Sequence, residues 1–267
     1  MLVSLLLSLA TLSALKSCED GNSQCGSWSD GGECTKNAAF MKDTCPLSCG
    51  ICKPPPLLEQ TDDPLLGPER VVLQIQWGGS SGSSGVNVPP QYGEIVLGFY
   101  REIAPVTVEH ILTLVRMGGY NTNEIFRVDR GFVAQIQGVE GGRRAPMSKS
   151  LREVAKQTVP DEFTKRVSHT RGMLSMGKFD KPNTGTSSFS MVLGNAAFLD
   201  NKYTIFGRVV GGDAVLSKLE QVETKKEGIF VMPKERVEIV SAVVMVSDGN
   251  GGLRLEDCEA EKRKVEL

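Results

Sequence analysis

Residues 126 to 135 read Phe126-Arg127-Val128-Asp129-Arg130-Gly131-Phe132-Val133-Ala134-Gln135, and this stretch is the most informative in the chain for the fold. Taken singly, Arg127 is typical of a solvated charge, and Phe132 and Val133 are typical of the core of any β-barrel. The pattern becomes specific only when Arg127, Phe132 at +5 and Gln135 at +8 are taken together.

Strand-type patterns surround this stretch. From residue 70 onward, Val71, Leu73 and Ile75 alternate with Val72, Gln74 and Gln76, which indicates a strand with one buried face. Similar runs occupy residues 94–100, 189–193, 205–210 and 237–246. The Gly- and Ser-rich residues 78–90 are too many for a tight hairpin and indicate a long insertion.

Two segments predict amphipathic helices. Pro105 opens the first, whose apolar positions recur with helical spacing until Gly118-Gly119 ends it. The second covers residues 214–222. Few helices among many strands predict a mainly β fold, a closed antiparallel barrel with helices covering its ends, and the alternative is a two-sheet sandwich.

Composition excludes several classes of function. The chain has 267 residues, with 32 acidic against 30 basic side chains, so it lacks the basic surface that nucleic acid requires. Phosphate-loop, serine-elbow and paired-histidine metal motifs are absent from the sequence, so we expect no metal and no cofactor. We expect structural or surface roles for His110 and His169, and a loop at residues 138–142.

The N-terminal residues predict secretion. Residues 1–14 are Leu-rich and end in small residues, as a signal peptide does, and a buried helix is the less favoured alternative. This uncharged segment is shorter than the length needed to cross a bilayer, so we expect no membrane span.

Six of the seven cysteines fall within residues 18–52, which predicts a small disulfide-rich domain, although Cys49 and Cys52 also have zinc-type spacing. Residues 53–70, which begin Lys53-Pro54-Pro55-Pro56, predict a Pro-rich linker. The cysteine spacing, with Asp20, Trp28 and Gly50, resembles the ShK-toxin-like (ShKT) domain. This resemblance implies the pairs Cys18–Cys52, Cys25–Cys45 and Cys34–Cys49. Toxins of this family use a Lys-Tyr pair where this chain has Ala39 and Phe40, so channel blocking is not expected.

The stretch at 126–135, followed by the blocks at 172–176, 182–184 and 199–207, resembles the cyclophilin-type peptidyl-prolyl cis-trans isomerases. The resemblance spans residues 71–248 and implies an eight-stranded antiparallel barrel capped by two helices. The blocks at 118–123 and 227–233 are similar to the divergent secretory-pathway type of plants and green algae. The implied function is assistance to protein folding in the secretory pathway.

The same resemblance implies the site. Its catalytic residues would be Arg127, Phe132 and Gln135, and its partners would be proline-containing segments of client proteins. Arg127 would donate to the prolyl nitrogen when the amide is twisted. The substrate-binding residues would be Val133, Gly177, Lys178, Ser188, Ser190, Phe198, Leu199 and Tyr203.

Several positions depart from the pattern of active relatives. Ser188 and Ser190 stand where those proteins have glutamine and phenylalanine, and Phe198 replaces a groove tryptophan. The loss of an aromatic wall at Ser190 predicts weaker binding and reduced activity. The alternative function is therefore a weakly active or inactive proline-peptide binder tethered through its ShKT module, whose own partner the sequence does not identify.

Residues 249–267 are charged and predict a solvated tail. This tail contains the seventh cysteine, Cys258, and ends Lys264-Val265-Glu266-Leu267, which resembles an endoplasmic reticulum retention signal except at Val265. We expect the protein in the lumen of the endoplasmic reticulum or secreted.

Overall fold

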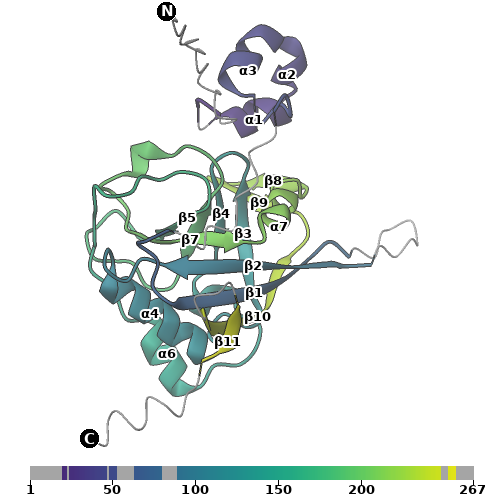
Figure 1. Cartoon of the computed structure of the whole chain (residues 1–267). Coiled ribbons are helices and arrows are strands. Elements are labelled where there is room, and N and C mark those ends of the chain that lie inside the picture. The colour runs from purple at the N-terminus through teal and green to yellow at the C-terminus, as the bar shows by residue number, and fades with distance from the viewer. Residues whose placement is uncertain are drawn as a thin grey trace, which may run out of the picture.

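The computed structural model describes residues 20–22, 24–46, 48–52, 63–79, 89–247 and 252–256. A large β-barrel and a small helical module make up these residues, and the module lies against one end of the barrel (Figure 1). The expected signal peptide, most of the Pro-rich linker, Cys18, Cys258 and the terminal tetrapeptide lie outside the described residues.

Eight antiparallel strands close into a ring. They pair in the order β1, β2, β7, β5, β6, β4, β3 and β10, and β10 then pairs with β1. The strands are β1 (Glu69–Trp77), β2 (Gln91–Phe99), β3 (Asn123–Asp129), β4 (Val133–Ile136), β5 (Met173–Met176), β6 (Phe189–Val192), β7 (Ile205–Gly211) and β10 (Val237–Ser247). The predicted barrel is confirmed, and the sandwich alternative is wrong.

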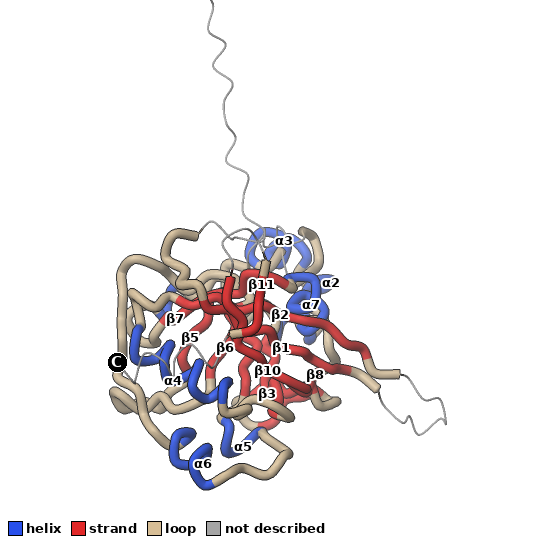
Figure 2. The backbone as a smooth tube through the Cα atoms, turned by 60° about the horizontal axis from the view of Figure 1, so that its bottom comes forward, coloured by secondary structure: helices blue, strands red, loops and turns tan. Residues whose placement is uncertain are grey.

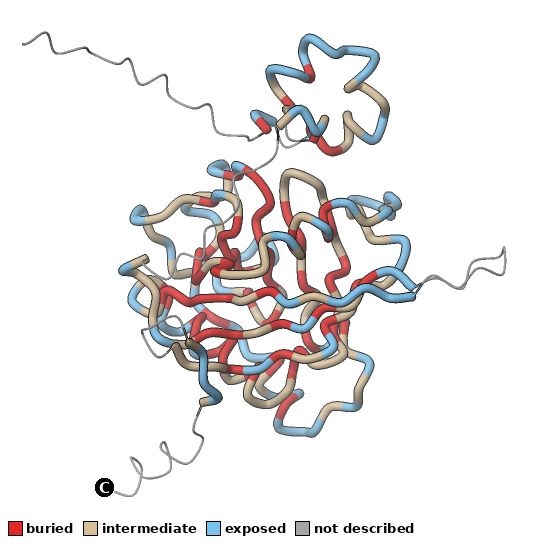
Figure 3. The backbone as a smooth tube through the Cα atoms, turned by 45° about the vertical axis from the view of Figure 1, so that its right-hand side comes forward, coloured by how far each residue is buried: buried red, intermediate tan, exposed pale blue. Residues whose placement is uncertain are grey.

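Alternation along the strands fills the barrel interior. In β1, Val71, Leu73 and Ile75 are each at most 1% exposed, whereas Gln74 between them is exposed. Phe189 packs edge-on against Phe206 inside the ring, with 5.5 Å between the ring centres. Buried residues therefore follow the strands, and exposed residues gather in the turns (Figure 3).

Helices lie around the strands rather than among them (Figure 2). The two predicted helices are present as α4 (Pro105–Arg116), with proline in its first turn, and α7 (Asp213–Leu219). A third helix, α6 (Lys149–Ala155), was not predicted; Ser148 caps it by accepting a hydrogen bond from the Leu151 amide.

The prediction of a loop at residues 138–142 is wrong. Gly138 precedes a single helical turn, α5 (Val139–Gly142). The amides of Gly141 and Gly142 both donate to the Gly138 carbonyl. Gly142 packs so closely on Asn123 that a Cβ atom would overlap its side-chain oxygen. The glycines therefore serve close packing and not a free loop.

Three short elements complete the barrel domain. A 3-10 turn, η1 (Ala197–Leu199), precedes β7, and a separate hairpin consists of β8 (Thr224–Glu227) and β9 (Phe230–Pro233). The tail after residue 249 was expected to be solvated or frayed. Leu253–Leu255 are exposed, as a solvated tail requires, but they are not frayed, because they form β11 and pair with the end of β10. β3 pairs only with the start of β10, so the edge of β10 beyond it is open to β11. Glu256 then pairs with Arg116 at 2.7 Å.

The small module is built from three short helices, α1 (Cys25–Asp30), α2 (Glu33–Lys36) and α3 (Ala38–Thr44). Disulfides join Cys25 to Cys45 and Cys34 to Cys49, as the ShKT resemblance implied. Cys52 is also disulfide-bonded, but the pair Cys18–Cys52 stays a prediction because Cys18 is not described. Within the described part of the chain, no helix is long and apolar enough to cross a membrane.

Candidate active site

A cavity of about 590 Å³ opens on the barrel surface beside β3, β4, β5 and β6. Strand register aligns four of its lining residues: Arg127 on β3 pairs with Gln135 on β4, Gln135 with Ser190 on β6, and Ser190 with Ser175 on β5. Directly paired residues of adjacent strands share one face of a sheet. Residues separated widely in the sequence thus form one continuous row across the cavity.

Arg127 is held in place by its own strand. Its Nη2 donates to Asp129 Oδ2 at 2.9 Å, and both side chains are less than one-fifth exposed. Its guanidinium carbon lies 5.2 Å from the centre of the Phe132 ring and 5.8 Å from that of Phe230, so two aromatic rings flank the cation. Among the described residues, the buried Nε of Arg127 has no hydrogen-bond acceptor.

The expected apolar floor is assembled. Phe132, Val133 and Leu199 all line the cavity, and Tyr203 lies at its border. Phe198 does not line the cavity: it is 48% exposed and stacks on Phe132, with ring centres 5.6 Å apart. Phe198 thus contacts the floor residue Phe132 without lining the cavity itself.

The polar side of the cavity is arranged around Ser188. Gln135 donates from Nε2 to Ser188 Oγ at 3.2 Å, and Ser188 Oγ donates to the Ile136 carbonyl at 2.8 Å. Gln135 is therefore fixed by Ser188, while Asp129 fixes Arg127. Ser190 is 8% exposed and brings a small side chain to the row. The cavity is consequently lined by small polar side chains at Ser188 and Ser190.

Gly177 and Lys178, which were predicted to bind substrate, line the cavity, and their role stays a prediction. The Gly177 amide already donates to the Ser188 carbonyl at 2.8 Å, so that donor is engaged within the barrel. Lys178 Nζ pairs with Asp161 at 2.7 Å, and both side chains are 13% exposed. Beside them, Phe179 is 80% exposed and gives the rim an apolar tip.

Sequence reasoning missed the opposite rim. The β8–β9 hairpin places Ile229, which is 87% exposed, and Phe230 on the cavity. Phe230 packs edge-on against Phe126 at 5.5 Å. Their contribution depends on how the hairpin folds back onto β3, which no local pattern predicts. By contrast, Asp129 could have been found, because residues two apart on a strand share a face and an acid there meets Arg127.

Below the cavity, a buried chain of hydrogen bonds ties β5 to η1. Ser175 Oγ lies 3.0 Å from Nε2 of His169, whose Nδ1 lies 2.7 Å from Asp200. Burial lowers the pKa of His169, although Asp200 acts in the opposite direction. The neutral ring therefore donates from Nδ1 to Asp200 and accepts at Nε2 from Ser175. His169, which is fully buried, has the structural role expected of it.

Comparisons with known proteins agree with this geometry. Residues 86–244 match the family model described as cyclophilin type peptidyl-prolyl cis-trans isomerase, and residues 17–52 match the ShK domain-like family. Peptidyl-prolyl cis-trans isomerase CYP23 of Arabidopsis thaliana is 51% identical over 200 residues, which cover 75% of this chain and 79% of that protein. Peptidyl-prolyl cis-trans isomerase B of Escherichia coli is 30% identical over 162 residues, covering 57% and 94%. The chain belongs to the cyclophilin-type peptidyl-prolyl cis-trans isomerase family and carries an N-terminal ShK-like domain.

Proposed function

We propose that this chain catalyses cis-trans isomerisation of X-Pro peptide bonds by stabilising the twisted amide. The observation that carries the proposal is a guanidinium held over an apolar floor. Arg127 lies against the ring of Phe132, and Val133 and Leu199 extend the same surface. A proline ring placed on this floor would bring its nitrogen toward the arginine. Relatives named as peptidyl-prolyl isomerases support the same activity.

The chemistry follows from the electronic structure of the amide. Resonance gives the C–N bond a rotation barrier of about 18–20 kcal/mol, and twisting localises a lone pair on the prolyl nitrogen. A donor aimed at that nitrogen interacts more strongly with the twisted state than with either planar state, so it lowers the barrier. The guanidinium of Arg127 has five N–H donors, while one carboxylate, Asp129, orients it. The reaction needs no nucleophile, no cofactor and no metal.

The floor and the rims would hold the substrate. Phe132 and Val133 would contact the proline ring, and Gln135, fixed by Ser188, would present its amide to the peptide backbone. Ser190 leaves the pocket without an aromatic side chain at this position of β6, so we expect weaker proline binding than a phenylalanine there would give. Turnover would then be limited more by capture of the peptide than by the chemical step.

A second candidate function is a proline-peptide binder without useful turnover. The small polar side chains of Ser188 and Ser190 favour it, because both stand in the wall of the cavity. Arg127 favours catalysis, since binding alone does not require a buried cation beside the proline floor. We therefore place the isomerase first.

The test is a protease-coupled isomerisation assay with a short X-Pro peptide. Arg127→Ala is expected to lower kcat/KM at least about tenfold while leaving peptide binding within about threefold, because the lost interaction belongs to the twisted state. Arg144→Ala is the matched control, since Arg144 is an exposed arginine whose salt bridge to Glu238 lies outside the cavity. An Arg127→Ala protein as active as an active wild type would reject Arg127 as the donor that stabilises the twisted amide. Wild-type binding without turnover would establish the binder instead.

We also propose that the protein works in the secretory pathway. The support is the disulfide-bonded module, because disulfides form and persist in oxidising compartments. Clients would be proline-containing segments of proteins that fold there. Trapping free thiols in intact cells should leave Cys25, Cys34, Cys45 and Cys49 unmodified. Rapid alkylation of these four residues before any reductant is added would contradict this localisation.

A further inference from the structure

The ShK-like module meets the barrel at the turn between β3 and β4. A Cβ atom on Gly26 of α1 would lie 2.7 Å from the carbonyl oxygen of Arg130 in that turn. In the same turn, Gly131 has a φ of +70°, and a Cβ atom there would lie 2.7 Å from Asp20 Oδ2 of the module. The two parts thus approach so closely that each requires a glycine at the contact.

The module side of this contact is rigid. Asp20 and Ser48 are 5% and 6% exposed, and the Asp20 carboxylate accepts hydrogen bonds from both the amide and the hydroxyl of Ser48. The Cys34–Cys49 disulfide closes a loop that contains Ser48. A buried, hydrogen-bonded carboxylate at a domain contact indicates a fixed position and not a chance encounter.

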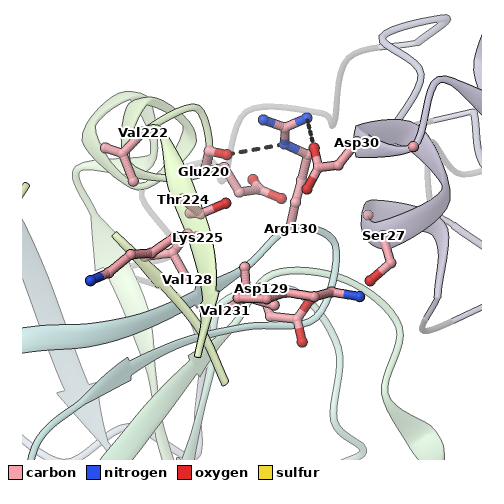
Figure 4. Close-up of a pocket in the computed structure, with 13 residues that line it drawn as sticks. Ser27, Asp30, Val128, Asp129, Arg130, Glu220, Val222, Thr224, Lys225 and Val231 are labelled. Carbon is pink, nitrogen blue, oxygen red and sulfur yellow. Dashed lines mark hydrogen bonds and ion pairs between the residues drawn. The ribbon is translucent and has the colours of Figure 1, made fainter. Parts of the chain in front are cut away.

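An ion pair adds to the contact between the module and the β3–β4 turn. Arg130 Nη1 lies 3.6 Å from Asp30 at the end of α1, and its Nε donates to the Glu220 carbonyl at 3.1 Å (Figure 4). A cavity of about 340 Å³ separates the module from the β8–β9 hairpin beside this pair. Arg130 therefore bridges the module and the segment after α7.

Residues of the barrel domain also hold the β3–β4 turn through hydrogen bonds. Glu220 is 5% exposed; one carboxylate oxygen accepts from the Gly131 amide at 3.1 Å and the other from Arg171 at 2.7 Å. Arg171 is in turn bonded to the Leu193 carbonyl and to Ser217. The turn is thus held between the module on one side and a buried ion pair on the other.

This turn is continuous with the candidate active site. Asp129, which orients Arg127, ends β3, and the Asp129 carbonyl accepts a hydrogen bond from the amide of Phe132. A small displacement of the turn would therefore move the carboxylate that holds the arginine and the ring that supports proline. Catalytic geometry tolerates such displacements poorly.

We propose that the ShK-like module docks on the β3–β4 turn of its own barrel and positions Arg127 and Phe132 through it. The partner of the module is thus this chain itself. The claim that the module positions Arg127 and Phe132 for catalysis rests on the proposed isomerase function. The claim that the module docks on the turn does not. In this account Glu220 and Arg130 are positioning residues, since they act through the turn.

The experiment compares two alanine substitutions in the full-length oxidised protein. Gly26→Ala adds a methyl group that meets the Arg130 carbonyl, in a helix where alanine is otherwise favourable. Gly31→Ala is the matched control: Gly31 has a φ of −77°, and its Cβ would touch only atoms of the module. We expect Gly26→Ala to speed amide hydrogen exchange at Gly131 and Phe132 at least about tenfold. We expect kcat/KM to fall about fivefold, mainly through kcat. Gly31→Ala should change neither.

Asp30→Arg provides a second variant that leaves the packing of α1 untouched and places like charges beside Arg130. It should change exchange and kcat in the same direction as Gly26→Ala. Unchanged exchange at residues 131 and 132 in both variants would overturn the docking. Faster exchange with unchanged kcat would overturn the positioning. A wild-type protein with no isomerase activity would reject the proposed function, while the exchange comparison would still decide the docking.

Discussion

At the scale of single residues, Ser190 is the position where this site differs most in its physical character from a complete proline pocket. Its side chain lies between Gln135 and Ser175 in the row across the barrel. Replacing it with phenylalanine would add roughly 1.5–3 kcal/mol of apolar contact for a fully buried ring, minus the strain of fitting it. We expect Ser190→Phe to raise kcat/KM about tenfold, chiefly by lowering KM, in the protease-coupled assay.

The control for this change is Ser190→Ala, which removes the hydroxyl without supplying a ring and should stay within about twofold of wild type. Circular dichroism and thermal unfolding would show that each variant is folded. A well-folded Ser190→Phe protein that gains nothing would mean that the missing aromatic is not what limits turnover.

The two histidines make stability depend on pH. Burial lowers the pKa of both His110 and His169 from the usual value of 6.5, against the hydrogen bonds that their rings donate to the Thr186 carbonyl and to Asp200, which raise it. Below about pH 6.5 the unfolded chain therefore binds protons that the folded chain resists, so acid favours unfolding. The free energy of unfolding should fall between pH 7 and pH 5, by at most about 1.4 kcal/mol per pH unit for each histidine.

Urea unfolding at a series of pH values measures this slope. His110→Gln is the informative variant, because the glutamine amide can still donate to the Thr186 carbonyl but does not titrate. Its slope should be shallower than that of wild type. Equal slopes for the two proteins would remove His110 from the explanation.

At the scale of elements, the β8–β9 hairpin supplies a wall that the barrel strands do not. Phe230 contacts both Phe126 and the Arg127 guanidinium. A cation–π contact of this kind is worth about 0.5–2 kcal/mol, depending on how far it is desolvated. We expect Phe230→Ala to lower kcat/KM about fivefold in the peptide assay, with a larger share in kcat than in KM.

Glu227→Ala is the matched variant for the hairpin, because Glu227 pairs directly with Phe230 across β8 and β9 but is exposed and outside the cavity. It should leave kcat/KM near the wild-type value. If both substitutions reduce activity equally, hairpin stability rather than the ring of Phe230 is responsible.

How far the elements could be predicted depended on their length and periodicity. β1 alternates over nine residues and α4 begins with proline and ends at paired glycines, so each leaves a clear pattern. β4 and β5 have four residues each, too few for a periodicity to emerge, and every residue of β5 is buried. β11 forms only because β3 leaves part of β10 unpaired, a fact about the assembled sheet.

The residues of the candidate site also divide into those with a local sequence pattern and those that tertiary packing brings to the cavity. Arg127, Phe132 and Gln135 lie within one short stretch, so their spacing could be read directly. Ile229 and Phe230 reach the cavity from about 100 residues further along the chain, through a hairpin whose orientation is set by tertiary packing. Local propensity carries no information about such an approach.

At the scale of the whole molecule, the two domains are stabilised in different ways. The barrel has a large apolar interior, whereas the module buries little beyond Cys25, Met41 and Cys45. Disulfides that close loops of 15 and 20 residues are each worth about 3 kcal/mol. We expect reductant to unfold the module and leave the barrel folded.

The two tryptophans report on the two domains separately, since Trp28 lies in α1 and the buried Trp77 in β1. In a Trp77→Phe protein, reduction should shift the remaining emission to longer wavelength, and in a Trp28→Phe protein it should not. A shift of both, or of neither, would contradict independent stabilisation of the two domains.

The closed ring of eight strands has a consequence for how this protein can handle unfolded chains. An open sheet can be extended by a strand added along a free edge, but each strand of the ring pairs with a neighbour on both sides over at least part of its length. Only short stretches, such as residues 91–95 of β2, are paired on one side alone. If the proposed isomerase function holds, we expect clients to be held mainly by the side chains that line the cavity and not by pairing along a sheet edge.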